Sequence, residues 1–186
     1  MRIIAGKFKG TTLYRSKDKK IRPLKDMVRE NIFNFLTHSN KISFQFERAN
    51  ILDLYSGTGS FGLECVSRGA LSVTFFENYK KVLPILKKNI FNIDLFKISK
   101  IVDHNIFDQK AFDNLKKKFD IIFLDPPYKE KKISQLLEKI IELNLLKKDG
   151  IFIIHRHKKE KDILPKKFKI LKEKSYGISK IIFGKN

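Results

Sequence analysis

Between residues 50 and 155, short apolar runs alternate with longer segments that carry apolar residues at helical spacing. The apolar runs are predicted strands, at residues 50–54, 71–77, 99–103, 119–125 and 150–155. Between them lie predicted helices, at residues 60–70, 78–93, 109–118 and 130–146. Pro84 should break or kink the second helix. Strands that alternate with helices in this way form a parallel sheet covered on both faces, so the pattern predicts an α/β fold.

The two ends of the chain depart from this alternation. Residues 167–184 contain two β-rich runs joined by a glycine turn, which predicts that the sheet ends in an antiparallel pair. At the other end, the sequence predicts a basic β-hairpin followed by an amphipathic helix that begins after Pro23. We therefore expect an N-terminal extension over residues 1–37 and a main domain over residues 50–186.

A glycine-rich turn, DLYSGTGSFG, joins the first predicted strand of the main domain to the helix that follows. Gly57, Gly59 and Gly62 have the spacing G-x-G-x-x-G of nucleotide-binding turns. Asp53 ends the strand, and its carboxylate would repel the pyrophosphate of a dinucleotide. S-adenosylmethionine instead carries an ammonium and a sulfonium, which a carboxylate attracts. The turn therefore predicts an S-adenosylmethionine site and disfavours a nicotinamide oxidoreductase.

Two more polar residues stand where predicted strands end. Glu77 closes the second strand, where a carboxylate can accept two hydrogen bonds from a ribose diol. Asn105 follows the third strand and can bond the exocyclic amine of adenine, with Asp103 as a neighbouring alternative. Strand ends are also polar in proteins without a ligand, so the sequence offers both residues as hypotheses for cofactor binding.

The fourth strand leaves the sheet through the tetrapeptide Asp-Pro-Pro-Tyr. In a doubly wound sheet this corner faces the same crevice as the glycine turn. Asp125 and the carbonyl of Pro126 are acceptors, and the rigid pair that Pro126 forms with Pro127 holds them in place. Tyr128 offers a ring on which a flat base can stack. Two acceptors aimed at one point can orient an amino group toward a methyl group, so the corner predicts methylation of a base amine.

The charge of the chain indicates a polyanionic partner. Forty Lys and Arg face 20 Asp and Glu, which gives a formal net charge of +20. Such an excess favours nucleic acid over a membrane as the partner, although an AT-rich genome also enriches lysine. Four of the seven arginines lie in the first 29 residues, and we predict that these contact RNA phosphates: Arg2, Arg15, Arg22 and Arg29.

Other residues give negative predictions. Cys65 is the only cysteine, and the sequence has neither an apolar run of membrane-spanning length nor a signal-like N-terminus, so we expect a cytoplasmic protein. Within that protein Cys65 should pack in the core. His155 and His157 share one face of a strand near Asp162, but no third ligand has suitable spacing, so we predict no metal site.

Four segments in this order resemble one known family: MRIIAGKFKG, RPLKDMVRENIFNFL, ILDLYSGTGSFGLECVSRGA and FDIIFLDPPY. The family is RsmD, the bacterial small-subunit ribosomal RNA guanine-N2 methyltransferases. The similarity runs from residue 2 to about residue 128 and continues loosely through YGIS, residues 176–179. It implies a class I, Rossmann-like methyltransferase with a mostly parallel seven-stranded sheet and an RNA-binding N-terminal hairpin. It also implies that the cofactor is held by Asp53, Gly57, Gly59, Glu77 and Asn105, and that catalysis lies at residues 125–128.

Three positions differ from the family's usual pattern. Leu24 and Met27 stand where the family has Thr and Arg, and Tyr79 stands near the place of a frequent second acid. The last difference suggests that Glu77 holds the ribose alone.

These observations predict a monomeric enzyme that transfers a methyl group from S-adenosylmethionine to a guanine N2 amine of small-subunit ribosomal RNA. The RNA can be naked or part of an assembled or partly assembled ribosomal subunit. One alternative is a methyltransferase for adenine N6 or another base amine of RNA or DNA. A second alternative is a basic RNA-binding assembly factor without catalytic activity.

Overall fold

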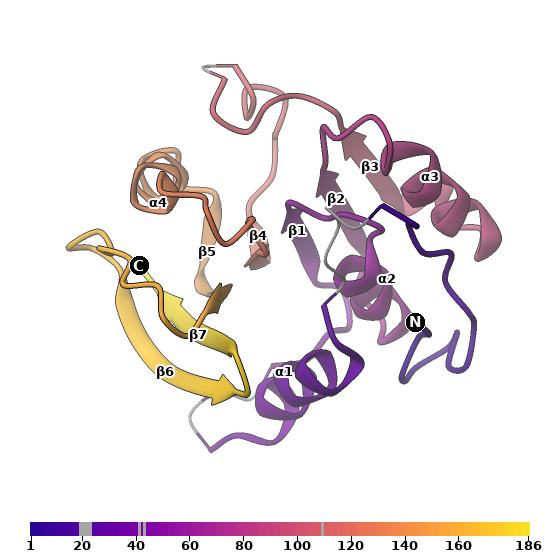
Figure 1. The fold of residues 1–186 in the computed structure, drawn as a ribbon, viewed down its shortest axis with the longest axis horizontal. Helices are drawn as coiled ribbons and strands as arrows, with labels where there is room; N and C mark the ends of the chain where they lie inside the picture. The colour runs from indigo at the N-terminus through magenta and orange to yellow at the C-terminus, as the bar shows by residue number, and fades with distance from the viewer. Residues whose placement is uncertain (19–23, 41, 43, 109) are drawn as a thin grey trace.

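A computed structural model of the chain describes residues 1–18, 24–40, 42, 44–108 and 110–186. Its centre is a seven-stranded sheet with the strand order β3-β2-β1-β4-β5-β7-β6 (Figure 1). The strands are β1 (Asn50–Leu54), β2 (Ser72–Phe76), β3 (Ser99–Val102), β4 (Phe119–Leu124), β5 (Leu146–His157), β6 (Lys169–Tyr176) and β7 (Ser179–Lys185). The helices are α1 (Asp26–His38), α2 (Ser60–Ser67), α3 (Leu83–Asn92), α4 (Ile133–Glu142) and a 3₁₀ turn (Phe96–Ile98).

The sheet is parallel from β3 to β5, and β7 joins it antiparallel to β5. The antiparallel pair β6–β7 that was expected from the tail is therefore confirmed. The strand order reverses between β1 and β4, which are hydrogen-bonded neighbours. In open α/β sheets the crevice at such a reversal is where ligands bind, so the fold brings the glycine turn and the Asp-Pro-Pro-Tyr corner together.

Side chains of the central strands alternate between two buried clusters. Ile51 and Ile121 point to one face, which α1, α2 and α3 cover, whereas Leu52 and Ile122 point to the other, which α4 covers. Figure 1 shows α4 on one side of the sheet and the other three helices on the opposite side. Helices thus cover both faces of the parallel part of the sheet, as is usual for parallel strands.

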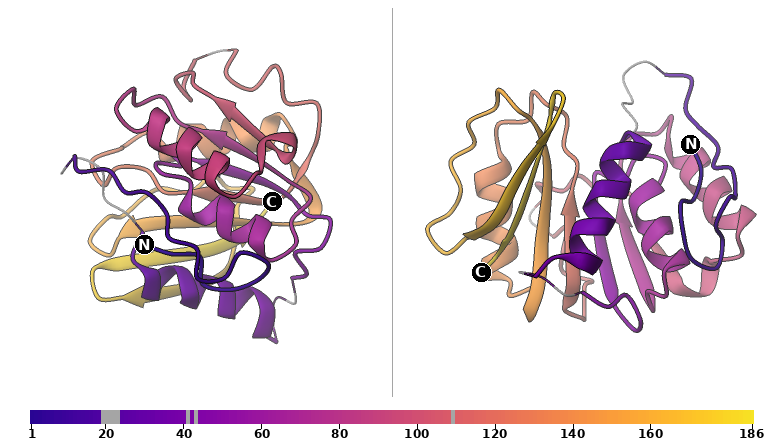
Figure 2. Two further views of the ribbon diagram at one scale, coloured as in Figure 1. Left: turned by 90° about the vertical axis from the view of Figure 1, so that its right-hand side faces the viewer. Right: turned by 90° about the horizontal axis from the view of Figure 1, so that it is seen from below.

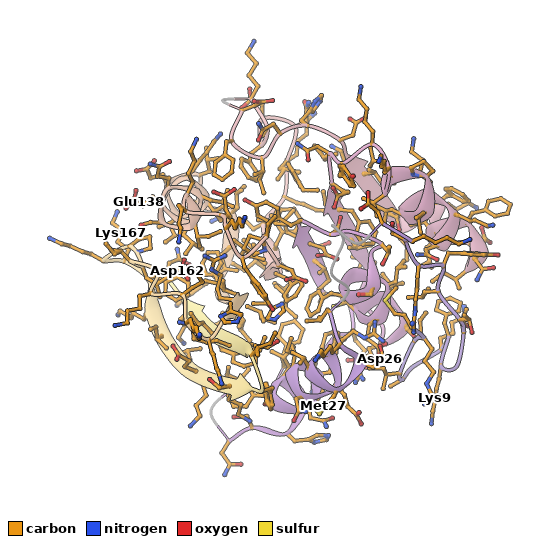
Figure 3. The ribbon with its side chains drawn as sticks, in the orientation of Figure 1. Lys9, Asp26, Met27, Glu138, Asp162 and Lys167 are labelled. Carbon is orange, nitrogen blue, oxygen red and sulfur yellow. The ribbon has the colours of Figure 1, made fainter. Side chains whose placement is uncertain are left out.

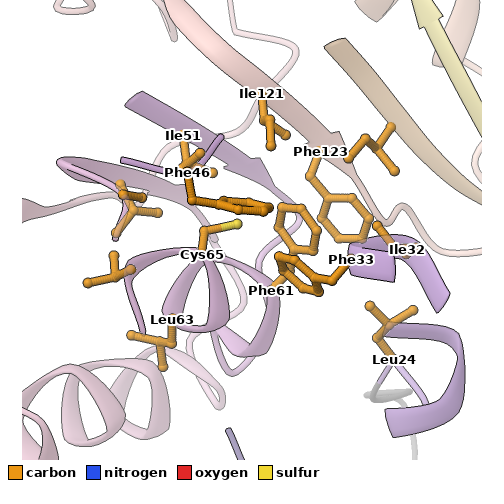
Figure 4. Close-up of a cluster of buried hydrophobic side chains, with 14 of the residues drawn as sticks. Leu24, Ile32, Phe33, Phe46, Ile51, Phe61, Leu63, Cys65, Ile121 and Phe123 are labelled. Carbon is orange, nitrogen blue, oxygen red and sulfur yellow. The ribbon is translucent and has the colours of Figure 1, made fainter. Parts of the chain in front are cut away.

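A stack of aromatic rings joins the helices of the first face to the sheet. Phe33 of α1 lies 5.3 Å from Phe61 of α2, and Phe61 lies 3.9 Å from Phe123 of β4, both measured between ring centroids (Figure 4). Cys65 lies in the same cluster and is fully buried, which agrees with its predicted place in the core. The stack fixes α2, which begins at the glycine turn, against the strand that carries the corner.

The N-terminal segment forms a short antiparallel pair. Ile3 N donates to Thr11 O at 3.0 Å, and a single bridge joins Arg2 to Thr12. The predicted hairpin is therefore present, but it lies against the main domain. Ile3 and Leu13 belong to the same buried cluster as the central strands, and Figure 2 shows the indigo segment running along α2 and α3.

Helix α2 anchors this segment through a buried carboxylate. Glu64 is fully buried and accepts hydrogen bonds from Ile4 N at 2.7 Å and from Ala5 N at 3.0 Å. Arg68 Nε donates to the same carboxylate at 2.9 Å. Asn89 of α3 makes a second anchor, because its amide exchanges two hydrogen bonds with the backbone of Tyr14.

Two local predictions fail. The helix predicted at residues 109–118 does not form over its described part: residues 110–114 are turns and 115–118 are irregular, because only a short apolar group, which includes Ala111 and Phe112, is buried there before a lysine run. Residue 109 lies outside the described residues. Pro84 does not kink a long helix, since α3 begins at Leu83 and the proline lies in its first turn, where the missing N–H is tolerated.

Within the described ranges, no helix is long and apolar enough to cross a membrane.

Gly6 should be essential for the docking of the hairpin, and Gly10 provides a matched control. Both have positive φ, +81° and +88°, but a Cβ on Gly6 would lie 1.8 Å from Ser67 O, whereas one on Gly10 would meet nothing within 4 Å. Gly10→Ala should lower the free energy of unfolding by about 1 kcal/mol through backbone strain. Gly6→Ala should lower it by roughly 3 kcal/mol, because the segment must also give up buried surface such as that of Ile3. Urea unfolding measures both values, and equal losses would contradict the docking seen here.

Candidate active site

A pocket of about 770 Å³ opens at the carboxyl ends of the central strands. This volume is in the usual range for a small-molecule site. Three segments supply most of its wall: the glycine turn, the residues after β2 and the Asp-Pro-Pro-Tyr corner. The predicted residues on the wall are Gly57, Glu77, Asp125, Pro126, Pro127 and Tyr128.

The glycine turn and Glu77 are hydrogen-bonded to each other. Glu77 Oε2 accepts from Gly57 N at 2.7 Å, and its Oε1 accepts from Tyr79 N at 2.8 Å. These contacts fix the carboxylate on the pocket wall. Gly59 lies beneath the turn, where it precedes α2 with φ +83° and a Cβ would meet Leu86 at 2.5 Å. Gly59 thus shapes the turn from below rather than lining the pocket.

Asp53 is buried behind the glycine turn, with 1% of its surface exposed. Its Oδ2 accepts from Gly62 N at 3.0 Å, whereas its Oδ1 has no hydrogen-bond partner among the described residues. Burial raises the pKa of the Asp53 carboxyl well above its usual range, and the charges of Asp125 and Glu77 raise it further. The site therefore favours a cation close to this group.

The Asp125 carboxylate is bound to a side chain that the sequence did not lead us to expect. His155 Nδ1 lies 2.7 Å from Asp125 Oδ1, and His155 Nε2 lies 2.9 Å from Ser179 Oγ. The cause is the register of the sheet. Phe123 pairs with Ile153, so the next side chains on the same face are Asp125 and His155. Counting by two along both strands would have indicated the pair.

The next residue of β5 holds the corner from the other face. Arg156 is fully buried, and its guanidinium donates to Pro127 O at 3.2 Å and to Glu130 O at 2.9 Å. It also makes two hydrogen bonds of 2.8 Å with Asp162, a residue that we had weighed only as a member of a metal site, which we rejected. The corner is therefore fixed by its two prolines, by the imidazole of His155 and by the ion pair of Arg156 with Asp162.

Tyr128 packs against two imidazoles. Its ring lies edge-on to His155 at 6.1 Å and to His157 at 5.0 Å, measured between centroids. Because Tyr128 also lines the pocket, its ring is placed beside the carboxylate that the same histidine holds.

Two predicted residues, Asn105 and Arg29, do not have the position we expected, and the prediction for a third, Arg22, is not tested. Asn105 is exposed and accepts from Phe107 N at 3.0 Å in a local turn, outside the pocket wall. Arg29 is fully buried and its Nη2 donates to Arg2 O, so it is not available to a phosphate. Arg22 lies outside the described residues. Of the four arginines, Arg2 and Arg15 are exposed.

The burial of Arg29 follows from its place on α1. Ile32, Phe33 and Leu36 form the buried stripe of this helix, and Arg29 stands three residues before the first of them. Helical spacing alone therefore placed the guanidinium on the buried face, and our prediction of a phosphate contact was wrong.

The chain is similar to known proteins along almost its whole length. The family model described as Conserved hypothetical protein 95 matches residues 1–185. Ribosomal RNA small subunit methyltransferase D of Haemophilus influenzae is 34% identical over 183 residues, which cover 96% of this chain and 90% of that protein. The protein of the same name from Buchnera aphidicola is 33% identical over 156 residues, 84% of this chain and 76% of its own length.

The fold is also that of a solved structure. The crystal structure of a candidate methylase from Haemophilus influenzae superposes with a TM-score of 0.75 and 31% identity, and it covers 100% of this chain and 97% of that one. The class I methyltransferase fold that the sequence predicted is therefore confirmed.

Asp53→Asn should stabilise the ligand-free protein, and the gain should grow with pH. The folded state raises the pKa of this carboxyl, whereas the unfolded chain leaves it near about 3.9. As the pH rises above that value, the unfolded chain releases a proton that the folded state retains, so the free energy of unfolding of the wild type falls. Asparagine does not titrate and escapes this loss.

Thermal melts at about pH 5 and about pH 8 measure the effect. The exposed Asp149 provides the control, because Asp149→Asn removes a carboxylate outside the pocket. A gain in Tm for Asp53→Asn that is the same at both pH values would contradict the raised pKa.

Proposed function

Because the chain belongs to the Conserved hypothetical protein 95 family, the RsmD family, we propose that it methylates small-subunit ribosomal RNA with S-adenosylmethionine as the donor. The observation that carries the proposal is the meeting of the glycine turn and the Asp-Pro-Pro-Tyr corner on one pocket wall. The names of the two ribosomal RNA methyltransferases support the class of substrate.

The residues of the pocket fit S-adenosylmethionine. Asp53 is a buried carboxylate with an unpartnered oxygen and a raised pKa, which suits a ligand with two positive centres. Glu77 stands on the wall, where each of its oxygens keeps a further lone pair for a ribose hydroxyl. When bound, the cofactor supplies a methyl group on a positively charged sulfur. Because the glycine turn separates Asp53 from the pocket, the carboxylate would act through its field, once the positive charge of the ligand has favoured loss of its proton.

The corner would hold the amine that receives the methyl group. Asp125 and the Pro126 carbonyl accept its hydrogens, and Tyr128 stacks on the base, which must be unpaired or flipped out. An exocyclic amine is a weak nucleophile, because its lone pair is delocalised into the ring, so positioning is the main contribution of these groups. Asp125 can also accept the proton that the amine loses. We propose guanine N2 as the acceptor, on the strength of the resemblance to the RsmD motifs.

The cytoplasmic location and the monomeric state expected from the sequence stay predictions. So does the choice between naked RNA and an assembled subunit.

Methyl transfer to small-subunit RNA tests the function directly. Wild-type protein should move labelled methyl from S-adenosylmethionine to naked RNA or to subunits from a strain that lacks the protein, and nucleoside mass spectrometry should find N2-methylguanosine. Asp125→Ala should lower kcat by a factor on the order of 10²–10³, since one preorganised contact to the reacting group is lost. Asp125→Asn keeps an acceptor oxygen and should retain much of the rate if Asp125 only orients the amine.

Tyr128 supplies a matched pair of variants for the same assay. Tyr128→Phe should have a small effect because stacking needs the ring, whereas Tyr128→Ala should weaken binding of the base by roughly 1–3 kcal/mol. N6-methyladenosine as the product would favour the first alternative function. Cofactor binding without turnover on any RNA would favour a non-catalytic assembly factor, and full activity of Asp125→Ala would show that the chemistry lies elsewhere.

RNA binding should depend on the exposed arginines of the N-terminal segment. Arg2→Ala combined with Arg15→Ala should weaken RNA binding. It should also reduce the slope of log K against log salt concentration by about 1.4 in magnitude, if each contact to single-stranded RNA contributes about 0.7. The backbone of Arg2 stays available to Arg29, so the fold should survive. Lys166→Ala combined with Lys167→Ala removes the same charge far from the hairpin, as the positions of Lys9 and Lys167 in Figure 3 show. Equal slopes for the two double variants would contradict a specific role of the hairpin.

A further inference from the structure

We propose that His155, held in turn by Ser179, is the positioning residue that keeps Asp125 in its working orientation. The inference rests on the methyltransferase function proposed above and concerns how its acceptor corner is prepared.

The three side chains form a continuous line of hydrogen bonds across β4, β5 and β7. The distances are 2.7 Å from Asp125 Oδ1 to His155 Nδ1 and 2.9 Å from His155 Nε2 to Ser179 Oγ. His155 and Ser179 are 7% and 4% exposed, so water has little access to the bond between them, whereas the Asp125 carboxylate reaches from this buried pair into the pocket. Hydrogen bonds shielded in this way are electrostatically stronger than exposed ones. His155 and Ser179 lie on strands β5 and β7, and Asp125 directly follows β4.

The chemistry of the partners fixes the direction of each bond. A carboxylate only accepts, so Nδ1 of His155 must carry a proton and donate it to Asp125. In the neutral ring Nε2 is then an acceptor, and the hydroxyl of Ser179 can donate to it. The carboxylate therefore selects the tautomer of His155, and Ser179 holds the ring of that tautomer in place through Nε2.

The two oxygens of Asp125 can therefore have different partners. Oδ1 is committed to His155, which leaves Oδ2 as the oxygen that can meet an amine in the pocket that Asp125 lines. Without the imidazole, the carboxylate would be free to turn about its Cβ–Cγ bond, and the angle between Oδ2 and the Pro126 carbonyl would no longer be fixed. If Asp125 accepts the amine proton on Oδ2, the bond to His155 still holds the group through Oδ1.

Two substitutions of His155 separate positioning from packing. His155→Leu fills similar space without a donor, and it should lower kcat on the order of 10²-fold, because misplacing a reacting group by about 1 Å has an effect of this size. KM for S-adenosylmethionine and for RNA should stay close to wild type. In His155→Asn the side-chain amide places an N–H near the position of Nδ1, and it should recover most of the lost rate.

His157 and Ser179 provide controls for this result. His157→Leu removes the other imidazole beside Tyr128 but leaves the Asp125 contact, so it should lower the rate far less than His155→Leu. Ser179→Ala should slow the wild type, yet it should have no effect in the His155→Asn background, where no Nε2 remains to be oriented. If the two substitutions lower log kcat by additive amounts, Ser179 does not act through the imidazole, and this part of the inference is contradicted.

Nitrogen NMR of the imidazole gives a measurement that does not depend on activity. In ¹⁵N-labelled protein without ligands, Nδ1 of His155 should carry a proton at neutral pH, and His155→Asn identifies its signal among those of the four histidines. An unprotonated Nδ1, or a His155→Leu variant with the wild-type rate, would overturn the inference. If instead wild-type protein methylates no RNA while Nδ1 is protonated, the proposed function fails and the positioning geometry stands.

Discussion

Three carboxylates meet where the carboxyl ends of β2, β1 and β4 lie next to one another. Burial raises the pKa of Asp53, and the charges of Asp125 and Glu77 raise it further. The local excess of negative charge contrasts with a chain whose formal net charge is +20. Such a cluster opposes folding in the absence of a ligand, and it attracts a cationic one, so the same interaction that weakens the empty protein prepares it for binding.

Each carboxylate is stabilised by a donor that the fold brings to it. Gly62 N donates to Asp53 and Gly57 N donates to Glu77, so the glycine turn supplies both carboxyl groups with backbone donors. The third charge, on Asp125, is met by His155 from the neighbouring strand. The glycine turn therefore has two roles. Its N–H groups donate to the carboxyl groups behind it, and its lack of side chains lets a ligand approach its surface.

The N-terminal segment belongs to the same structural unit as the sheet, although we expected it to be an extension. The buried Glu64 holds its backbone against α2, and Ile3 is part of the main core. Asn89 links the N-terminal segment to the glycine turn, because its Nδ2 donates both to Tyr14 O at 3.1 Å and to Thr58 O of that turn at 2.9 Å. An RNA chain that binds Arg2 and Arg15 would thus rest on elements that also support the cofactor turn.

The sequence by itself determined the α/β alternation, the glycine turn, the strand-end carboxylates and the corner, because these depend on neighbouring residues and on the rule that parallel strands collect their carboxyl ends at one edge. The sequence also contained two signals that we missed. The helical spacing of Arg29 places it on the buried face of α1, and counting by two along β4 and β5 pairs Asp125 with His155. Only the tertiary structure decided that Asp53 lies behind the turn, that Asn105 closes a local turn outside the pocket, and that Arg156 clamps the corner. Those outcomes depend on the register between strands and on the depth of packing, which are set by contacts between residues far apart in the chain.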